Sequence, residues 1–231
     1  MPKRLIAIAL VAIVSLGVVA GFTALRLPAA PSAPIATLSI RQPAQPEEAT
    51  VHGVEVRNFQ IQANRSSARF TIDEILAGSL NTVVGTTNQV SGQIAVDSMG
   101  PSNAQIGTVL INARTLTTDD AQRNRIINNL ILSTSQYEFI AFSPTAIRGL
   151  PETATLGSPY SLQIDGDLTI RDVSRPVSFA ATVTPVSDTE LQGSATTTVR
   201  YADWGINIPQ VPRIAGVDDN VKLQLDFVAT S

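Results

Sequence analysis

The chain contains no cysteine, and this absence excludes several kinds of site at once. Disulfide bridges, thiolate nucleophiles, cysteine-ligated zinc or iron–sulfur centres and a lipidated N-terminal cysteine all require that residue. Histidine is nearly absent too, since His52 is the only one in 231 residues. Because His52 falls in or beside a proline-rich linker, neither a Ser-His-Asp triad nor a histidine metal cage can be assembled in the folded domain.

Positive charge is also scarce. Lysine occurs only at Lys3 and Lys222, and the net charge at pH 7 is −3. From Asn58 onward, eleven Arg and Lys residues stand against sixteen Asp and Glu residues. Nucleic-acid binding needs clustered cations to neutralise phosphates, so this composition argues against a nucleic-acid partner.

Pairs of carboxylates are the remaining candidates for acid–base chemistry or for a divalent cation. They are Asp119 with Asp120, Asp165 with Asp167, and Asp218 with Asp219. Each pair also suits a structural position, namely a helix N-terminus, the solvent side of a strand and a turn, and we favour these readings. Glycine-rich phosphate loops and dinucleotide fingerprints are absent from the sequence. We therefore expect that the protein has no catalytic residues and no metal site, and that it is not an enzyme.

The N-terminus carries a long apolar run. Lys3 and Arg4 precede an uncharged stretch from Leu5 to Leu25, whose 21 residues would span ~30 Å as a helix. Residues 1–27 are therefore predicted to be a retained membrane anchor, and a cleaved signal peptide is the alternative. In both cases the remainder is expected to be exported and extracytoplasmic, and a retained helix would tether it to the cytoplasmic membrane.

A linker separates this run from the main domain. Five prolines lie between Pro28 and Pro46 among small and polar residues, a composition that favours extended chain over a packed core. Residues 28–57 are therefore assigned to the linker. Residues 58–231 are assigned to one domain, because 44% hydrophobic content and this length suit a single core.

The domain shows the alternation of a half-buried antiparallel sheet. In segment 161–183 the expected inward residues are Leu162, Ile164, Leu168, Ile170, Val177, Phe179 and Val183. Pro176 is placed at the first residue of the second strand, where its missing N–H is tolerated. Further strands are predicted at 59–62, 69–72, 90–96, 106–113, 139–146, 199–204 and 221–227. Thr118 followed by two aspartates predicts the N-cap of a helix over 119–132.

The hairpin also carries a family resemblance. Its segment GDLTIRDVSRPVSF resembles the G-x-L-T-I-R-G-V-T-x-P-V signature of the YceI-like lipid-binding proteins. Further landmarks are similar to that family and occur in its order. They are FQIQANRSSARF, VSGQIAVD, INARTLTTDDAQRNR, YEFIAF, RYADWGI and VDDNVKLQLDF.

The resemblance implies a fold class and a function. The expected fold is all-β, an antiparallel eight-stranded lipocalin-like barrel with one covering helix, preceded by the N-terminal membrane helix or signal segment. The expected function is non-enzymatic binding or carriage of an isoprenoid or other long-chain amphiphilic lipid at the cell envelope. The alternative is a barrel with a filled core that contacts another envelope protein. Small residues expected to face inward, namely Ala95, Ala113, Ala180 and Ala195, permit a cavity.

The chain departs from the family at two histidine positions. Arg65 and Ser66 stand where relatives often have His-Ser, and Arg123-Asn124 opens the segment where relatives commonly have R-D-x-H-L. Ligand contacts through those histidines cannot be transferred to this chain.

The candidate site residues follow from the barrel pattern. Expected to line the ligand are Phe70, Ile94, Ile111, Phe142, Ile164, Leu168, Phe179 and Trp204. Candidates for the head group, a phosphate or quinone, are Arg123, Arg125 and Arg171, for which a solvated helix face and hairpin tip are the competing readings. No cofactor is expected apart from a lipid or quinone ligand. The N-terminal segment is expected to contact the membrane. The sequence does not indicate an oligomeric state.

Overall fold

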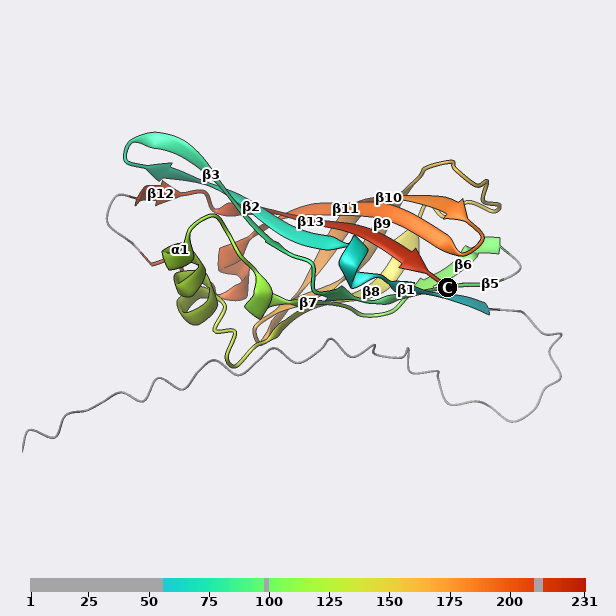
Figure 1. Ribbon diagram of the computed structural model, residues 1–231, viewed down its shortest axis with the longest axis horizontal. Coiled ribbons are helices and arrows are strands. Elements are labelled where there is room, and N and C mark those ends of the chain that lie inside the picture. The colour runs from blue at the N-terminus through green and yellow to red at the C-terminus, as the bar shows by residue number, and fades with distance from the viewer. Residues whose placement is uncertain (1–55, 98–99, 210–213) are drawn as a thin grey trace, which may run out of the picture. The chain divides into compact units, whose positions relative to one another are not determined.

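The computed structural model describes residues 56–97, 100–209 and 214–231. The predicted N-terminal membrane helix or signal segment, the linker and His52 lie outside these ranges. Within the described ranges, no helix combines the length and the hydropathy needed to span a membrane. The described residues form an all-β domain with one longer helical segment, as Figure 1 shows.

The strands follow one another with short connections over most of the domain. Their bounds are β1 Val56–Ile61, β2 Ser67–Leu76, β3 Ser79–Thr87, β4 Val90–Ser91, β5 Gln93–Asp97, β6 Gly100–Ile106, β7 Val109–Asn112, β8 Phe139–Arg148, β9 Tyr160–Ile170, β10 Val173–Ser187, β11 Glu190–Arg200, β12 Ile214–Val217 and β13 Asn220–Thr230. The helical segments are the 3-10 helices η1 Ala63–Arg65, η2 Ala113–Thr115 and η4 Tyr201–Trp204, the α-helix α1 Ala121–Ile126, and the π-helix η3 Ile127–Ile131.

All these strands belong to one antiparallel sheet that curls on itself. The order along the sheet is β4-β7-β8-β9-β10-β11-β13-β1-β5-β6, and beside it β2 pairs with β13, while β3 and β12 pair with β2. The first strand in this order, β4, is followed in the chain by β5, which stands near the other end of the order. The sheet therefore curls to bring its two sides together, and one of its faces is enclosed.

This sheet consists of thirteen strand segments, so it does not confirm the predicted count of eight strands. The sheet contains several interruptions and irregularities. The 3-10 turn η1 separates β1 from β2, and register shifts occur between Ala95 and Asp97 and between Ile214 and Gly216. Such bulges bend a strand and break the hydrogen-bond ladder without ending the run.

The predicted hairpin is confirmed, with a tighter turn than expected. Strands β9 and β10 pair from Val173 with Ile170 to Val183 with Tyr160, and Arg171 and Asp172 alone form the turn. Pro176 lies inside β10 rather than at its start. It is tolerated there because the pairing of β10 with β11 begins only at Ala180, so one side of β10 has no neighbouring strand at Pro176.

Two local predictions need correction. The helix begins at Ala121, and its N-cap is Asp120, whose carboxylate accepts a hydrogen bond from the Arg123 N–H at 2.6 Å. Thr118 instead donates its hydroxyl hydrogen bond to Asn124 Oδ1 at 2.8 Å. The strand predicted at 199–204 stops early, because β11 ends at Arg200 and the chain turns through η4 over Tyr201–Trp204.

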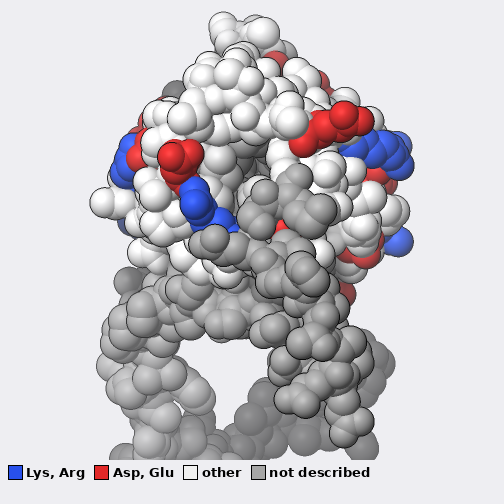
Figure 2. Space-filling model, turned by 90° about the vertical axis from the view of Figure 1, so that its right-hand side faces the viewer, with Lys and Arg blue, Asp and Glu red and all other residues white. Residues whose placement is uncertain are grey.

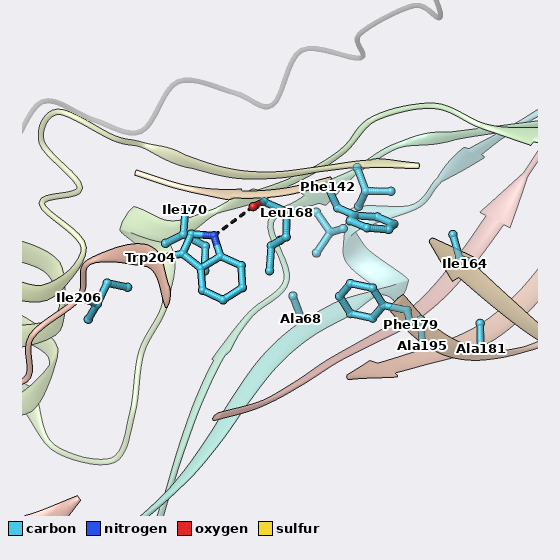
Figure 3. Packing of buried hydrophobic residues seen from close by; sticks show 12 residues of the cluster. Ala68, Phe142, Ile164, Leu168, Ile170, Phe179, Ala181, Ala195, Trp204 and Ile206 are labelled. Atoms are coloured by element: carbon cyan, nitrogen blue, oxygen red, sulfur yellow. Dashed lines mark hydrogen bonds between the residues drawn. The ribbon is translucent and has the colours of Figure 1, made fainter. Parts of the chain in front are cut away.

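The buried side chains enclosed by the sheet form two adjoining clusters. In the larger one, the rings of Phe142 and Phe179 meet edge to face with centroids 4.9 Å apart. Trp204, 2% exposed, donates its indole hydrogen bond to the carbonyl of Leu168 at 3.0 Å (Figure 3). This bond fixes η4 against β9 and explains why the segment leaves the sheet pattern.

Phenylalanine rings cover glycines on neighbouring strands. Gly193 of β11 stands opposite Phe227 of β13, and Gly85 of β3 stands opposite Phe70 of β2. A Cβ at Gly193 would lie 2.6 Å from the Phe227 ring and 2.8 Å from the Thr182 carbonyl oxygen. These glycines therefore make room for rings that lie flat along the enclosed face.

We predict that Gly193→Ala destabilises the domain, because the added methyl group forces the Phe227 ring or the β10 backbone to move. The expected loss in free energy of unfolding is about 1–3 kcal/mol, measured by urea denaturation. Gly216→Ala is the control, since a Cβ there meets nothing within 4 Å. Equal denaturation midpoints for the two variants would contradict this account of the glycine–phenylalanine pairs.

Candidate functional site

The curled sheet encloses a cavity of about 1290 Å³. Its wall is mainly apolar, because alternate residues of each strand point inward. On β9 the lining residues are Leu162, Ile164, Leu168 and Ile170, and on β10 they include Phe179 and Val183. The inward pattern predicted for these six positions is therefore confirmed.

Seven of the eight predicted ligand-lining residues stand on the cavity wall: Phe70, Ile94, Ile111, Phe142, Ile164, Leu168 and Phe179. Trp204 does not line this cavity. It packs at the edge of the larger core cluster and is held there by the hydrogen bond to Leu168. Among the small residues, Ala195 lines the cavity, whereas Ala180 is exposed and the prediction that it faces inward is wrong.

The cavity reaches exposed residues at both ends of the domain. At the end with the β10–β11 turn, Arg57, Glu152 and Asp188 belong to its lining and are exposed. Figure 2 shows this end, where acidic and basic side chains lie on both flanks of a hollow surrounded by uncharged atoms. At the other end, near α1, exposed Leu76 and Gln122 belong to the lining. We call these the turn end and the helix end.

One buried charge stands on the wall at the helix end, and it is absent from the residues expected from the sequence. Glu74 of β2 is 5% exposed and lines the cavity. Its Oε1 accepts hydrogen bonds from Asn81 Nδ2 at 2.9 Å and from Arg123 Nη2 at 3.2 Å. The sequence held a signal for it, because strand alternation places Glu74 on the same face as the apolar residues Ala68, Phe70, Ile72 and Leu76.

The three head-group candidates are not brought together. Arg123 of α1 lines the cavity, but it is bound to Glu74 and, through Nη1 at 2.6 Å, to Asp119. Arg125 is exposed and does not line the cavity. Arg171, in the β9–β10 turn, has its Cζ 6.0 Å from the Tyr137 ring centroid. It does not line the cavity either. Arg123 alone is placed to meet a ligand.

The carboxylate pairs occupy structural positions. Asp165 is ion-paired with Arg148 at 2.7 Å, and hydrogen bonding from Ser178, then from Gln163, lowers the pKa of its carboxyl. Asp218 accepts a hydrogen bond from the Asn220 N–H at 2.8 Å in the turn before β13. In the part of the chain that the structure describes, no three His, Asp or Glu side chains are grouped closely enough to hold a metal ion.

A phenol also belongs to the wall. Tyr201 of η4 lines the cavity, and burial, followed by the nearby charge of Asp219, raises the pKa of its hydroxyl. The group is therefore held neutral across the physiological range, where it can donate or accept a hydrogen bond.

Comparison with protein-family models identifies this domain. The model described as the YceI-like domain matches residues 59–229, about three quarters of the chain. Comparison with curated proteins found no match.

Two solved structures share the fold. A polyisoprenoid binding domain from Saccharophagus degradans, implicated in plant cell wall breakdown, superposes with a TM-score of 0.60 at 12% identity, covering 75% of this chain and 98% of that one. BcnA of Burkholderia cenocepacia superposes with a TM-score of 0.57 at 16% identity, covering 74% of this chain and 99% of the other. At these identities the likeness establishes the fold alone.

The Glu74–Arg123 pair generates a prediction about stability. Arg123→Met is expected to lower the free energy of unfolding by roughly 1.5–3 kcal/mol, because it leaves a buried carboxylate with one neutral donor. Adding Glu74→Gln should restore part of the loss. Arg125→Met, on the exposed side of the same helix, should change stability by less than ~0.5 kcal/mol. Chemical denaturation of the four proteins checks this, and equal losses for the two arginine variants would refute it.

Proposed function

The chain belongs to the YceI-like family, and from this premise we propose that its domain binds an isoprenoid or another long-chain amphiphilic lipid inside the cavity. The single observation that carries the proposal is an apolar cavity of about 1290 Å³ that runs to exposed residues at both ends. A long apolar chain can lie along such a cavity while its head group stays near one end. The S. degradans relative is described as polyisoprenoid binding, which supports the same ligand class.

We also propose that the thirteen segments group into eight strands that close a barrel. β1 and β2 both run antiparallel to β13, so they point the same way and extend one strand. The same argument joins β3, β4 and β5 along β2 and β1, then β6 with β7, and β12 with β13. Strands β8 to β11 complete a ring of eight, a size that can hold a small ligand.

The energetics suit a carrier. Each buried methylene contributes ~0.8 kcal/mol, so about ten of them supply ~8 kcal/mol before ordering costs. This corresponds to a dissociation constant near ~1 μM, at which a protein can both take up and release a lipid. Binding of this kind needs no catalytic group, and we propose a non-enzymatic function.

We place this activity at the cell envelope, outside the cytoplasmic membrane. The apolar run from Leu5 to Leu25 supports an anchor or an export signal, and the chain leaves the linker for β1 at Val56.

The lipid extracted from the purified protein tests the proposed function. We expect native mass spectrometry of residues 56–231, secreted by a bacterial host and purified without detergent, to show an adduct of one long-chain lipid per domain. Denaturing extraction should release that lipid for identification. A protein mass without adduct, unchanged after incubation with a membrane lipid extract, would exclude a lipid carrier.

Filling part of the cavity should weaken lipid binding. Ala195 of β11 is buried on the wall, so Ala195→Trp places an indole where two or three methylenes would lie. The expected loss is roughly 2 kcal/mol, about 30-fold in affinity, measured by titration with a fluorescent isoprenoid. Thr198→Trp is the matched control, since Thr198 is exposed on the outer face of the same strand. Equal affinities of the two variants would argue against the cavity as the binding site.

A further inference from the structure

The charges on the cavity wall do not suit an anionic ligand. Among the described residues, the lining contains three guanidinium groups and five carboxylates. The arginines are Arg57, Arg69 and Arg123, and the acids are Glu74, Asp97, Asp120, Glu152 and Asp188. The described wall therefore carries a net charge of −2, with acids at both ends. A phosphorylated head group would meet this excess at the turn end, where Arg57 stands against Glu152 and Asp188, and would meet arginines already paired with acids at the helix end.

The arginines of the helix end are already neutralised. Arg123 contacts two carboxylates, those of Glu74 and Asp119, and a third, Asp120, caps its helix. Arg69 pairs with Asp226 at 2.6 Å. A phosphate at this end would have to displace a carboxylate to gain a guanidinium, and the displaced carboxylate would remain close by.

Glu74 is the one buried carboxylate among the described lining residues. The hydrogen bonds from Asn81 and Arg123 both go to Oε1. A carboxylate has acceptor capacity on both oxygens, so a group on the ligand can donate to the same side chain. A hydroxyl group on the ligand would supply such a donor.

We propose that the lipid carries an uncharged, hydroxyl-bearing head group that donates a hydrogen bond to Glu74 at the helix end. Glu74 acts as the specificity residue, because it accepts from an alcohol and repels a phosphate. Arg123 orients the Glu74 side chain through their contact at 3.2 Å and does not bind a phosphate. This inference rests on the proposed lipid-binding function and narrows it to one class of head group.

The test uses the full chain in phosphatidylcholine nanodiscs, with Glu74→Gln as the variant. The probe is a geranylgeraniol analogue that carries a diazirine next to its hydroxyl group, and mass spectrometry locates the crosslink. Geranylgeraniol and geranylgeranyl diphosphate compete for the site. Each competitor partitions to the same extent into discs that carry the wild type and into discs that carry the variant. The ratio of the alcohol's to the diphosphate's half-maximal inhibitory concentration can therefore be compared between the proteins.

We expect wild-type crosslinks in the β2 and α1 segments that contain Glu74 and Arg123. In Glu74→Gln the diphosphate should compete about tenfold better relative to the alcohol than it does in the wild type, which corresponds to 1.4 kcal/mol. Glutamine removes the charge and keeps an acceptor for the alcohol. Asp172→Asn, the same charge change at an exposed residue outside the lining, should leave the ratio unchanged.

A second variant keeps the test decisive if Glu74→Gln does not fold. Asp120→Asn removes one charge at the same end and retains an equivalent N-cap, and it should shift the ratio in the same direction. An unchanged ratio in folded variants, or crosslinks confined to the turn end, would overturn the inference and leave lipid binding intact. Failure of both competitors to displace the probe would overturn the proposed function and this inference together.

Discussion

The pairing of β13 is the constraint on which the rest of the structure depends. This strand pairs with β11 along its whole length on one side, and with β1 and β2 on the other. It thereby joins the last part of the chain to the first and encloses one face of the sheet. Side-chain alternation has a period of two, so a slip of one residue in β13 would turn Leu223, Leu225 and Phe227 away from the interior.

Side chains on the enclosed face pack against one another along the wall, and the centre stays open. Phe142 and Phe179 pack edge to face, and Phe70 and Phe227 lie over glycines of the adjacent strands. These contacts order the wall without filling the centre, which retains about 1290 Å³. The fold therefore obtains its stability from the wall and leaves the interior open.

The sequence predicted the parts of the fold that strand periodicity controls. Alternation in 161–183 identified the hairpin and its inward face, and seven expected lining residues stand on the cavity wall. Local patterns failed where a tertiary contact decided the conformation. The hydrogen bond from Trp204 to Leu168 holds η4 out of the strand pattern. Arg123 was a candidate for binding a phosphate head group because its partner Glu74 is far away in sequence, and their pairing could not be predicted.

Electron density in the cavity of the protein purified from its host, without added lipid, tests the central claim most directly. The account predicts one continuous, elongated feature that runs past Phe142 and Phe179 and ends near Glu74. Separate water peaks, or side chains rearranged to fill the cavity, would contradict it.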